Sequence, residues 1–271
     1  MIYSIVNGGL GNQLFQYAAA RGLAVLNNSD VCLLIESYKT FKLFPFLLDK
    51  LELPIIIKDN IVNDPNRESL YILREGLPAK SLLPYFTDRY KDSSVLLEGY
   101  WQDPRYFDGI KDLLYKEIIK TPLHNDRVDC AIHIRRNDRL DEKTQKIYGV
   151  FAPDYYRYAV AMMEDVSGGN IEHYSIYTDD VQWASEYRDY IIYNGKPTTI
   201  KHTGPIYDLI DLACCDHFII PNSSFSWWSA WLSKKNLNKK VICPDKWAFD
   251  IIHNSPHIQP KDDPDWFQIS V

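Results

Sequence analysis

Short apolar runs alternate along this chain with stretches of helical spacing. Runs of strand character occupy residues 2–6, 31–36, 95–98, 130–134, 174–177, 217–220 and 241–243. Between them, apolar residues recur every three or four positions and predict helices at residues 12–26, 104–120, 153–166, from 181 onward, 206–213 and 227–232. This alternation predicts an α/β fold on mostly parallel sheets with right-handed crossovers.

Other segments carry weaker patterns. Prolines and mixed charge break up residues 39–84, which predicts irregular structure with short helices that shape an acceptor pocket. Residues 135–150 read as a polar loop and residues 191–193 as one more strand. The polar, turn-rich residues 121–127 predict a linker between two domains. We place these domains at residues 1–125 and 126–271.

Composition excludes several classes of protein. A net charge of −6 and a pI near 5.6 argue against a general nucleic-acid binder. No apolar run approaches the roughly 20 residues of a membrane span, and the N-terminus lacks a basic leader and a cleavage site. The five cysteines show no CxxC spacing, so we expect reduced, buried thiols.

Three predicted strands of the second half end in polar side chains. In a parallel sheet the carboxyl ends of the strands open on one edge, where ligands bind. That edge collects His133, Arg135, Arg136, Asp138, Asp179, Asp180, Asn222, Ser223, Ser224 and Ser226.

The charged members of this set allow more than one interpretation. Arg135 and Arg136 offer fork-shaped donors matched to a diphosphate, or they form surface ion pairs with carboxylates. Asp179 and Asp180 cap the following helix, accept from a guanine, or hold a divalent metal. Neighbouring arginines make a metal less necessary, because they already neutralise phosphate charge.

The neutral members also have alternatives. The serines at 223, 224 and 226 form an anion nest together with the start of the following helix. Alternatively, Ser224 or Ser226 simply caps that helix. His133, beside two arginines, should have a depressed pKa and act as a neutral hydrogen-bonding partner. The tryptophans at 227, 228 and 231 should pack the helix onto the sheet. No nucleophile elbow supports a hydrolase.

Two turns in the first half are candidates for ligand contact. The loop at residues 7–11 puts glycines between a strand and a helix, which suits either an anion or merely a tight turn. It lacks the GxGxxG spacing of a dinucleotide site. Tyr100 and Trp101 follow a strand and form either a sugar platform or part of the core.

Four segments together resemble one family, the α-1,2-fucosyltransferases of bacteria and animals. They are GGLGNQLFQYA at 8–18, HIRRND at 133–138, YTDD at 177–180 and NSSFSWW at 222–228. They stand in that family's order over essentially the whole chain. The HxRRxD pattern is shared with other fucosyltransferases, whereas GGLGNQ and NSSFSWW together point to the α-1,2 group.

This resemblance implies a GT-B-type fold of two Rossmann-like domains facing across a cleft. It implies inverting, metal-independent transfer of L-fucose from GDP-β-L-fucose to the 2-hydroxyl of a terminal galactose. The expected acceptor is a galactose-terminated oligosaccharide or lipid-linked glycan in surface polysaccharide synthesis. The expected location is the cytoplasm, with peripheral association at the inner membrane as a further hypothesis.

The resemblance also implies roles for single residues. Arg135 and Arg136 would bind the diphosphate, and Asp138 is our candidate base. Asn12 would line the reaction centre. The donor-binding set is Gly9, Gly11, His133, Arg135, Arg136, Asp179, Asp180, Asn222, Ser223, Ser224 and Ser226. Two rival hypotheses are a non-catalytic glycan-binding relative, with Tyr100 and Trp101 as its platform, and a transferase that uses another GDP-sugar.

Overall fold

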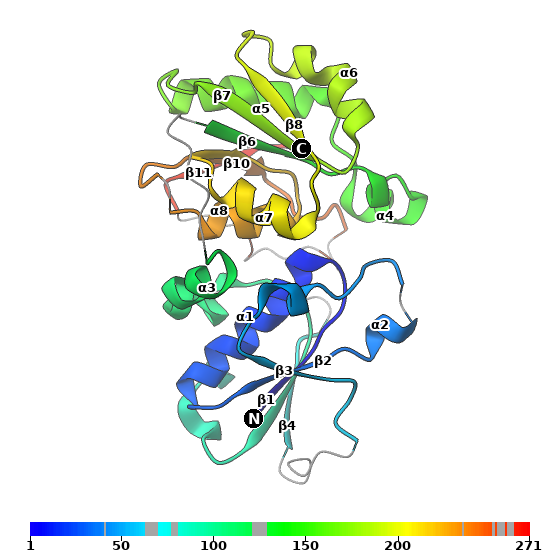
Figure 1. Cartoon of the computed structure of the whole chain (residues 1–271), viewed down its shortest axis with the longest axis vertical. Helices are drawn as coiled ribbons and strands as arrows, with labels where there is room; N and C mark the ends of the chain where they lie inside the picture. Colours follow the sequence, from blue (N-terminus) through cyan, green and yellow to red (C-terminus); the bar gives the residue numbers. More distant parts are fainter. Residues whose placement is uncertain are drawn as a thin grey trace. The chain divides into compact units, whose positions relative to one another are not determined.

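A computed structural model describes residues 1–40, 42–62, 70–76, 81–120, 129–234, 236–250, 253, 258 and 263–271 (Figure 1). The chain forms two compact units, residues 1–120 and 121–271. The predicted linker at 121–127 and the predicted boundary near residue 125 lie outside the described residues.

The first unit contains a five-stranded parallel sheet in the order β3-β2-β1-β5-β4. Its strands are β1 (Ile2–Ile5), β2 (Val31–Leu34), β3 (Ile55–Lys58), β4 (Leu70–Arg74) and β5 (Ser94–Glu98). The long helix α1 (Leu10–Leu26) follows β1 and buries most of its residues. Gly22 lets α1 pack closely against the backbone of Tyr106, because a Cβ at residue 22 would lie 2.5 Å from the carbonyl oxygen of Tyr106.

Short elements complete this unit. They are α2 (Ser37–Thr40), α3 (Lys111–Ile118) and the 3₁₀ turns η1 (Leu48–Leu51), η3 (Leu83–Tyr85), η4 (Asp88–Tyr90), η5 (Pro104–Tyr106) and η6 (Asp108–Ile110). The helix predicted over 104–120 is thus only α3, preceded by two 3₁₀ turns. The prediction of irregular structure over 39–84 missed β3 and β4, which are half-exposed strands.

The second unit contains a six-stranded parallel sheet in the order β11-β10-β9-β6-β7-β8. Its strands are β6 (Asp129–Ile134), β7 (His173–Thr178), β8 (Thr198–Lys201), β9 (His217–Ile219), β10 (Val241–Pro244) and β11 (Trp266–Ile269). This is the doubly wound Rossmann order, which reverses between β6 and β9. The predicted α/β class is confirmed. Two units, each built on a parallel sheet with helices, are the domain composition of the GT-B type.

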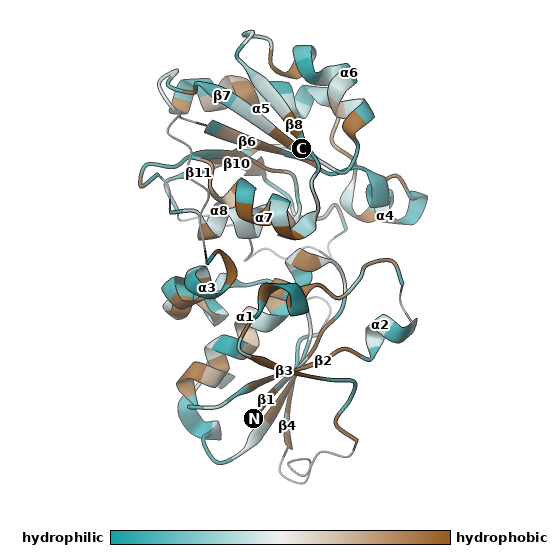
Figure 2. Ribbon diagram, viewed as in Figure 1, coloured by the Kyte–Doolittle hydropathy of each residue, from teal (hydrophilic) through white to brown (hydrophobic). Residues whose placement is uncertain are grey.

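Helices flank this second sheet on both faces. They are α5 (Pro153–Val166) and α6 (Val181–Ile191) on one face, and α7 (Pro205–Ala213) and α8 (Ser224–Leu232) on the other. The connection after β6 contains η7 (Asn137–Arg139) and α4 (Glu142–Tyr148). In Figure 2, α4 is mostly hydrophilic, whereas the central strands carry hydrophobic residues. The alternation of side chains along β6 explains how one strand serves two cores.

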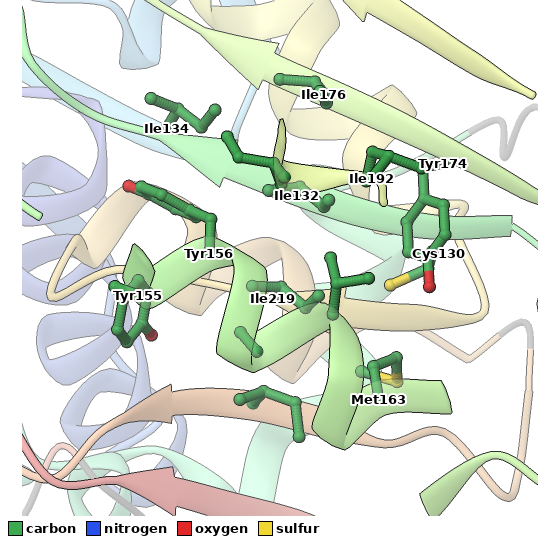
Figure 3. Close-up of a cluster of buried hydrophobic side chains, with 14 of the residues drawn as sticks. Cys130, Ile132, Ile134, Tyr155, Tyr156, Met163, Tyr174, Ile176, Ile192 and Ile219 are labelled. Carbon is green, nitrogen blue, oxygen red and sulfur yellow. The ribbon is translucent and has the colours of Figure 1, made fainter. Parts of the chain in front are cut away.

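One core lies between the sheet and helices α5 and α6. Figure 3 shows Ile132 and Ile134 of β6 with Tyr156 and Met163 of α5, all of which are buried. A second core contains Ala131 of β6 with residues of α7 and α8. The predicted packing role of the tryptophans is confirmed, since Trp227, Trp228 and Trp231 are buried against one another.

Several predicted boundaries in this unit were wrong. Residue 191 ends α6, residues 192–193 form a bend and a turn, and the strand lies later, at β8. The loop predicted at 135–150 contains α4. No strand was predicted after residues 241–243, but β11 follows them. Helix α8 begins at Ser224, three residues before the predicted start.

All five cysteines are free and buried, as predicted. Within the described ranges, no helix combines the length and the apolar character that a bilayer span requires.

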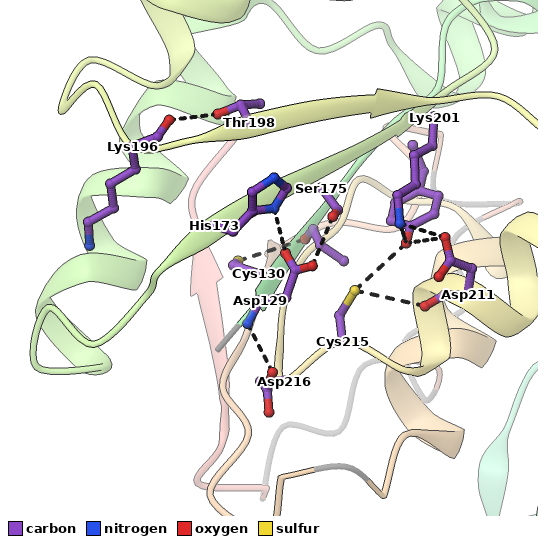
Figure 4. A network of polar contacts seen from close by, with 12 residues as sticks. Asp129, Cys130, His173, Ser175, Lys196, Thr198, Lys201, Asp211, Cys215 and Asp216 are labelled. Carbon is purple, nitrogen blue, oxygen red and sulfur yellow. Dashed lines mark hydrogen bonds and ion pairs between the residues drawn. The ribbon is translucent and has the colours of Figure 1, made fainter. Parts of the chain in front are cut away.

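A buried polar network lies where β6 and β7 begin (Figure 4). Asp129 accepts from His173 Nδ1 at 3.2 Å and from Ser175 Oγ at 3.0 Å, and its backbone N–H donates to Asp216 Oδ2 at 2.9 Å. Because Asp129 is the first residue of β6, this network is at the strand end opposite to the polar residues that follow Ile134. It fixes the start of the sheet.

Candidate functional site

The strand order of the second unit reverses between β6 and β9, and polar residues follow both strands. His133 is the penultimate residue of β6, and Ser226 is in the first turn of α8. His133 Nδ1 lies 2.8 Å from Ser226 Oγ, so one hydrogen bond joins the two sides of the reversal point. Open α/β sheets bind ligands beyond the strand ends at this point.

His133 is neutral at physiological pH. Burial, with a further contribution from the charge of Arg135, lowers its pKa to about 3. The predicted direction of the shift is confirmed, although burial rather than the arginines is its leading cause. A neutral imidazole can hold the Ser226 hydroxyl in one orientation.

Arg135 is held by carboxylates. Its Nε lies 2.6 Å from Asp138 Oδ1 and 3.6 Å from Asp179 Oδ2. Burial acts to raise the pKa of Asp138, but the hydrogen bond and the charge of Arg135 outweigh it, and the pKa falls below its usual value. Asp138 therefore orients Arg135, and it is a weaker base than an unpaired carboxylate.

Arg136 is fixed on three sides. Its Nε lies 3.1 Å from Asp180 Oδ2, and its guanidinium lies 4.3 Å from the ring centroid of Trp183. Its backbone N–H donates to Asp179 Oδ1 at 2.8 Å. The ion-pair alternative therefore describes the contacts of Arg135 and Arg136 in this structure.

The two aspartates after β7 differ in their roles. Asp180 is the N-cap residue of α6, and its Oδ1 accepts from the Trp183 backbone N–H at 3.0 Å, which confirms the capping alternative for this residue. Asp179 caps nothing in that helix and instead binds the backbone of Arg136. Over the described residues, no group of three or more His, Cys, Asp or Glu side chains could hold a metal ion.

The turn after β9 is tied to neighbouring loops. Asn222 Nδ2 donates to the carbonyl of Tyr148 at 2.8 Å and to that of Trp247 at 2.9 Å. The side-chain amide of Asn222 thus joins this turn to the end of α4 and to the loop that follows β10.

The serines of this turn do not cap α8 with their side chains. The N-cap residue is Ser223, whose side chain makes no capping hydrogen bond. Ser224 and Ser226 lie inside the helix, so the prediction that one of them is the cap was wrong. Ser226 is fully buried and bonded to His133, while Ser223 is 5% exposed at the helix start.

Sequence reasoning missed Arg139, which lies just beyond the HIRRND segment. Its Nη2 donates to the carbonyl of Asn222 at 3.1 Å, and its guanidinium lies 4.1 Å from the ring centroid of Tyr148. The available signal was a third arginine in the same loop. Its burial depends on Tyr148 of α4, in a segment that we predicted as a loop.

The first unit has its own polar turn after β1. Gly8 has a φ of 76°, which supports the tight-turn alternative for this loop. Gly9 precedes α1 with an extended backbone, and Gly11 lies inside the helix. Asn12 Oδ1 accepts from Gln102 Nε2 at 2.9 Å.

Of the two alternatives for the turn after β5, Trp101 supports a place in the core rather than a sugar platform. Trp101 is fully buried and packs against Phe86 and Tyr106, whereas Tyr100 is 43% exposed. Sequence reasoning also missed Glu75, whose Oε2 accepts from the backbone N–H groups of Tyr100 and Trp101 at 2.8 Å each. This carboxylate holds the left-handed backbone of Trp101, with a φ of 57°.

A family comparison decides the assignment. The model described as "Glycosyl transferase family 11" matches residues 1–256. The chain belongs to glycosyl transferase family 11. It is therefore a glycosyltransferase.

Three relatives of this family 11 enzyme are similar over most of its length. "Alpha-1,2-colitosyltransferase" of Escherichia coli is 29% identical, with 89% of this chain and 96% of the relative covered. "O-antigen biosynthesis glycosyltransferase WbnK" of Escherichia coli is 28% identical, with 91% and 94% covered. "Galactoside 2-alpha-L-fucosyltransferase" of Caenorhabditis elegans is 24% identical, with 87% and 68% covered.

The structure gathers most of the predicted site residues of this enzyme in the second unit. His133 lies near the end of β6, and those that follow β6, β7 and β9 are Arg135, Arg136, Asp138, Asp179, Asp180, Asn222, Ser223, Ser224 and Ser226. Gly9, Gly11 and Asn12 belong to the first unit. Their assignment to the reaction centre stays a prediction.

Proposed function

We propose that this family 11 enzyme transfers L-fucose from GDP-β-L-fucose to the 2-hydroxyl of a terminal galactose, with inversion and without a metal ion. The observation that carries the proposal is the pair of polar segments at the reversal point of the second sheet. Arg135 and Arg136 follow β6, and the serine turn follows β9, with the bond between His133 and Ser226 joining the two sides.

In this proposal the diphosphate of the donor lies between the arginines and the start of α8. As the glycosidic bond breaks, negative charge grows on the departing GDP. The guanidinium groups of Arg135 and Arg136 and the N–H groups at the helix start stabilise that charge. His133 keeps Ser226 in place, and Asp179 or Asp180 reads the guanine.

The acceptor hydroxyl must lose its proton during transfer. Asp138 is the proposed base, although its ion pair with Arg135 makes it a weak one. The oxygen of the leaving phosphate can accept the proton late in the reaction instead. Gly9, Gly11 and Asn12 would line the reaction centre, as the family resemblance implies.

We further propose that the acceptor is a galactose-terminated oligosaccharide or a lipid-linked glycan of a surface polysaccharide. A relative of similar length, named for O-antigen biosynthesis, supports this class of acceptor. Synthesis in the cytoplasm, with peripheral association at the inner membrane, is part of the same proposal.

A second candidate is the transfer of another GDP-sugar. The relative that is 29% identical is named for colitose, which is fucose without its 3-hydroxyl group. By contrast, the burial of Trp101 removes the platform on which the hypothesis of a non-catalytic glycan binder depends.

Donor competition distinguishes these candidates. The enzyme is incubated with a galactoside and equal amounts of GDP-fucose and GDP-colitose, with EDTA present, and the linkage of the product is read by NMR. We expect a 2-linked fucosyl product. Preferred transfer of colitose would establish the second candidate.

A binding measurement covers the remaining alternative. GDP should raise the melting temperature and UDP should not, because only a ligand that binds the native state stabilises it. A glycan binder without transferase activity would respond to neither nucleotide.

A further inference from the structure

The two arginines assigned to the diphosphate are already compensated by carboxylates. Arg135 pairs with Asp138, Arg136 pairs with Asp180, and Asp179 lies 3.6 Å from Arg135. Two guanidinium groups thus face three carboxylates, which leaves one negative charge in excess. A diphosphate that approaches this cluster would meet repulsion unless a further cation contributes.

Arg139 is such a cation. Among the described residues, no carboxylate forms an ion pair with it, and its Nε and Nη1 are buried without a hydrogen-bond partner. Burial lowers its pKa to about 10, so it stays charged at neutral pH. The carboxylates of Asp138 and Asp179 act on its charge, but neither forms an ion pair with it, and a buried N–H group without an acceptor is destabilising.

The position of Arg139 links it to the same site. It ends η7, in the loop after β6, and its Nη2 reaches the carbonyl of Asn222 after β9. Its guanidinium therefore spans the reversal point of the sheet. Tyr148 covers one face of it and shields it from water.

We propose that Arg139 is a further donor-binding residue, whose charge offsets the excess carboxylate of this cluster and whose unpartnered N–H groups donate to the diphosphate of the nucleotide. The inference rests on the proposed function, because it takes the anion to be the diphosphate of a GDP-sugar. A phosphate oxygen that reaches Nε and Nη1 displaces no existing hydrogen-bond partner. The charge also acts on an anion that it does not touch, because the site is poorly solvated.

Arg139→Gln and Arg139→Lys test the proposal in the full-length enzyme, with GDP, GMP and guanosine as probes in titration calorimetry. Glutamine can keep the hydrogen bond to Asn222 and removes the charge, whereas lysine keeps the charge. We expect R139Q to bind GDP at least about tenfold more weakly, GMP with a smaller loss, and guanosine unchanged. R139K should retain more GDP affinity than R139Q.

Arg157→Gln is a matched control. Arg157 also stacks on tyrosine, at 4.8 Å from the ring centroid of Tyr190, and also donates to a backbone carbonyl, that of Tyr190 at 2.6 Å. Because Arg157 contacts Tyr190 and Tyr193, neither of which we assign to the donor site, R157Q should bind GDP like the wild type.

The melting temperature without ligand separates a binding role from a structural one. Removing two buried N–H groups that have no acceptor should leave the melting temperature of R139Q close to that of the wild type, whereas loss of a structural contact would lower it. The inference is overturned if R139Q binds GDP like the wild type. It is also overturned if R139Q melts earlier and binds all three probes equally weakly.

The proposed function can fail separately. A wild-type enzyme that does not bind GDP would remove both the proposed function and this inference. A wild-type enzyme that binds GDP and transfers fucose, beside an R139Q variant with equal GDP affinity, would remove the inference alone. If R139Q does not fold, the comparison of GDP with guanosine in R139K decides, since equal losses for GDP and guanosine would contradict a phosphate role.

Discussion

Arg135 illustrates how one side chain can be both anchored and available. Its Nε is bound to Asp138 at 2.6 Å, and its side chain is one quarter exposed. This arrangement fixes the direction of the guanidinium before a ligand arrives. Such preorganisation avoids an ordering cost during the reaction.

Arg135→Ala should reduce turnover at least about a hundredfold, because one donor aimed at developing charge contributes about 3 kcal/mol. The measurement is the kcat for fucose transfer at saturating donor. Arg188→Ala is the control, since Arg188 pairs with Asp189 on the surface of α6. Turnover near the wild-type level would refute the role that we assign to Arg135.

His133 gives stability a defined pH dependence. Its pKa is near 3 when folded and near 6.5 when unfolded, so between these values only the unfolded chain binds the proton. The contribution of His133 to the free energy of unfolding is therefore fully present above pH 6.5. It falls by about 1.4 kcal/mol for each pH unit below that value, down to the folded-state pKa. His133→Gln should flatten the slope in urea unfolding between pH 4.5 and 6.5. Parallel slopes for the two proteins would contradict this prediction.

At the residue scale, much of the site could be predicted from the sequence. The rule that parallel strands present their carboxyl ends on one edge was enough to bring the HIRRND segment and the serine turn together. Arg139 could not be found this way, because its burial comes from Tyr148 and Asn222, which belong to different elements. Spacing along the chain holds no information on such contacts.

At the scale of elements, the loops beyond the strand ends are joined by side-chain bonds. Asn222 is the centre of this bonding, with one amide group shared between the carbonyls of Tyr148 and Trp247. Helix α4 and the end of β10 thereby keep a fixed relation to the start of α8.

Asn222→Ala should lower the free energy of unfolding by about 1–3 kcal/mol, because two buried carbonyls lose their donor. Denaturant unfolding measures the change. Asn170→Ala is the control: its amide donates to Ser167 on an exposed turn, and its loss should cost less than about 0.5 kcal/mol. Equal losses of unfolding free energy in the two variants would show that the hydrogen bonds of Asn222 to Tyr148 and Trp247 do not stabilise the fold beyond an ordinary turn contact.

The elements that were missed share a physical cause. β8 is an edge strand with one exposed and three half-buried residues, so it has no apolar run to detect. Ile191 and Ile192 are apolar because the end of α6 packs on the core, whereas Tyr193 is exposed, and three such residues cannot distinguish a helix end from a strand. The buried central strands β1, β6, β7 and β9 were found because both of their faces are covered.

At the scale of the whole molecule, each unit has its own parallel sheet and its own buried core. Tyr3, Cys32 and Leu96 belong to a core of the first unit, and Ile132 and Ile176 belong to a core of the second. The effect of a nucleotide can therefore be measured unit by unit.

GDP alone should protect backbone amides at residues 133–139, 178–183 and 222–227 from hydrogen exchange. These segments follow β6, β7 and β9, where we place the nucleotide. Residues 14–26 of α1 serve as the internal control and should exchange at the same rate with and without GDP. Equal protection across both units would place the nucleotide elsewhere.

The cysteines offer a built-in reporter of unfolding. Cys32 lies in the first unit, the other four lie in the second, and all five are buried and free. A maleimide reagent can modify these thiols only after the surrounding core has opened. Mass spectra taken during slow denaturation should consequently show one adduct or four, according to which half of the chain gives way first.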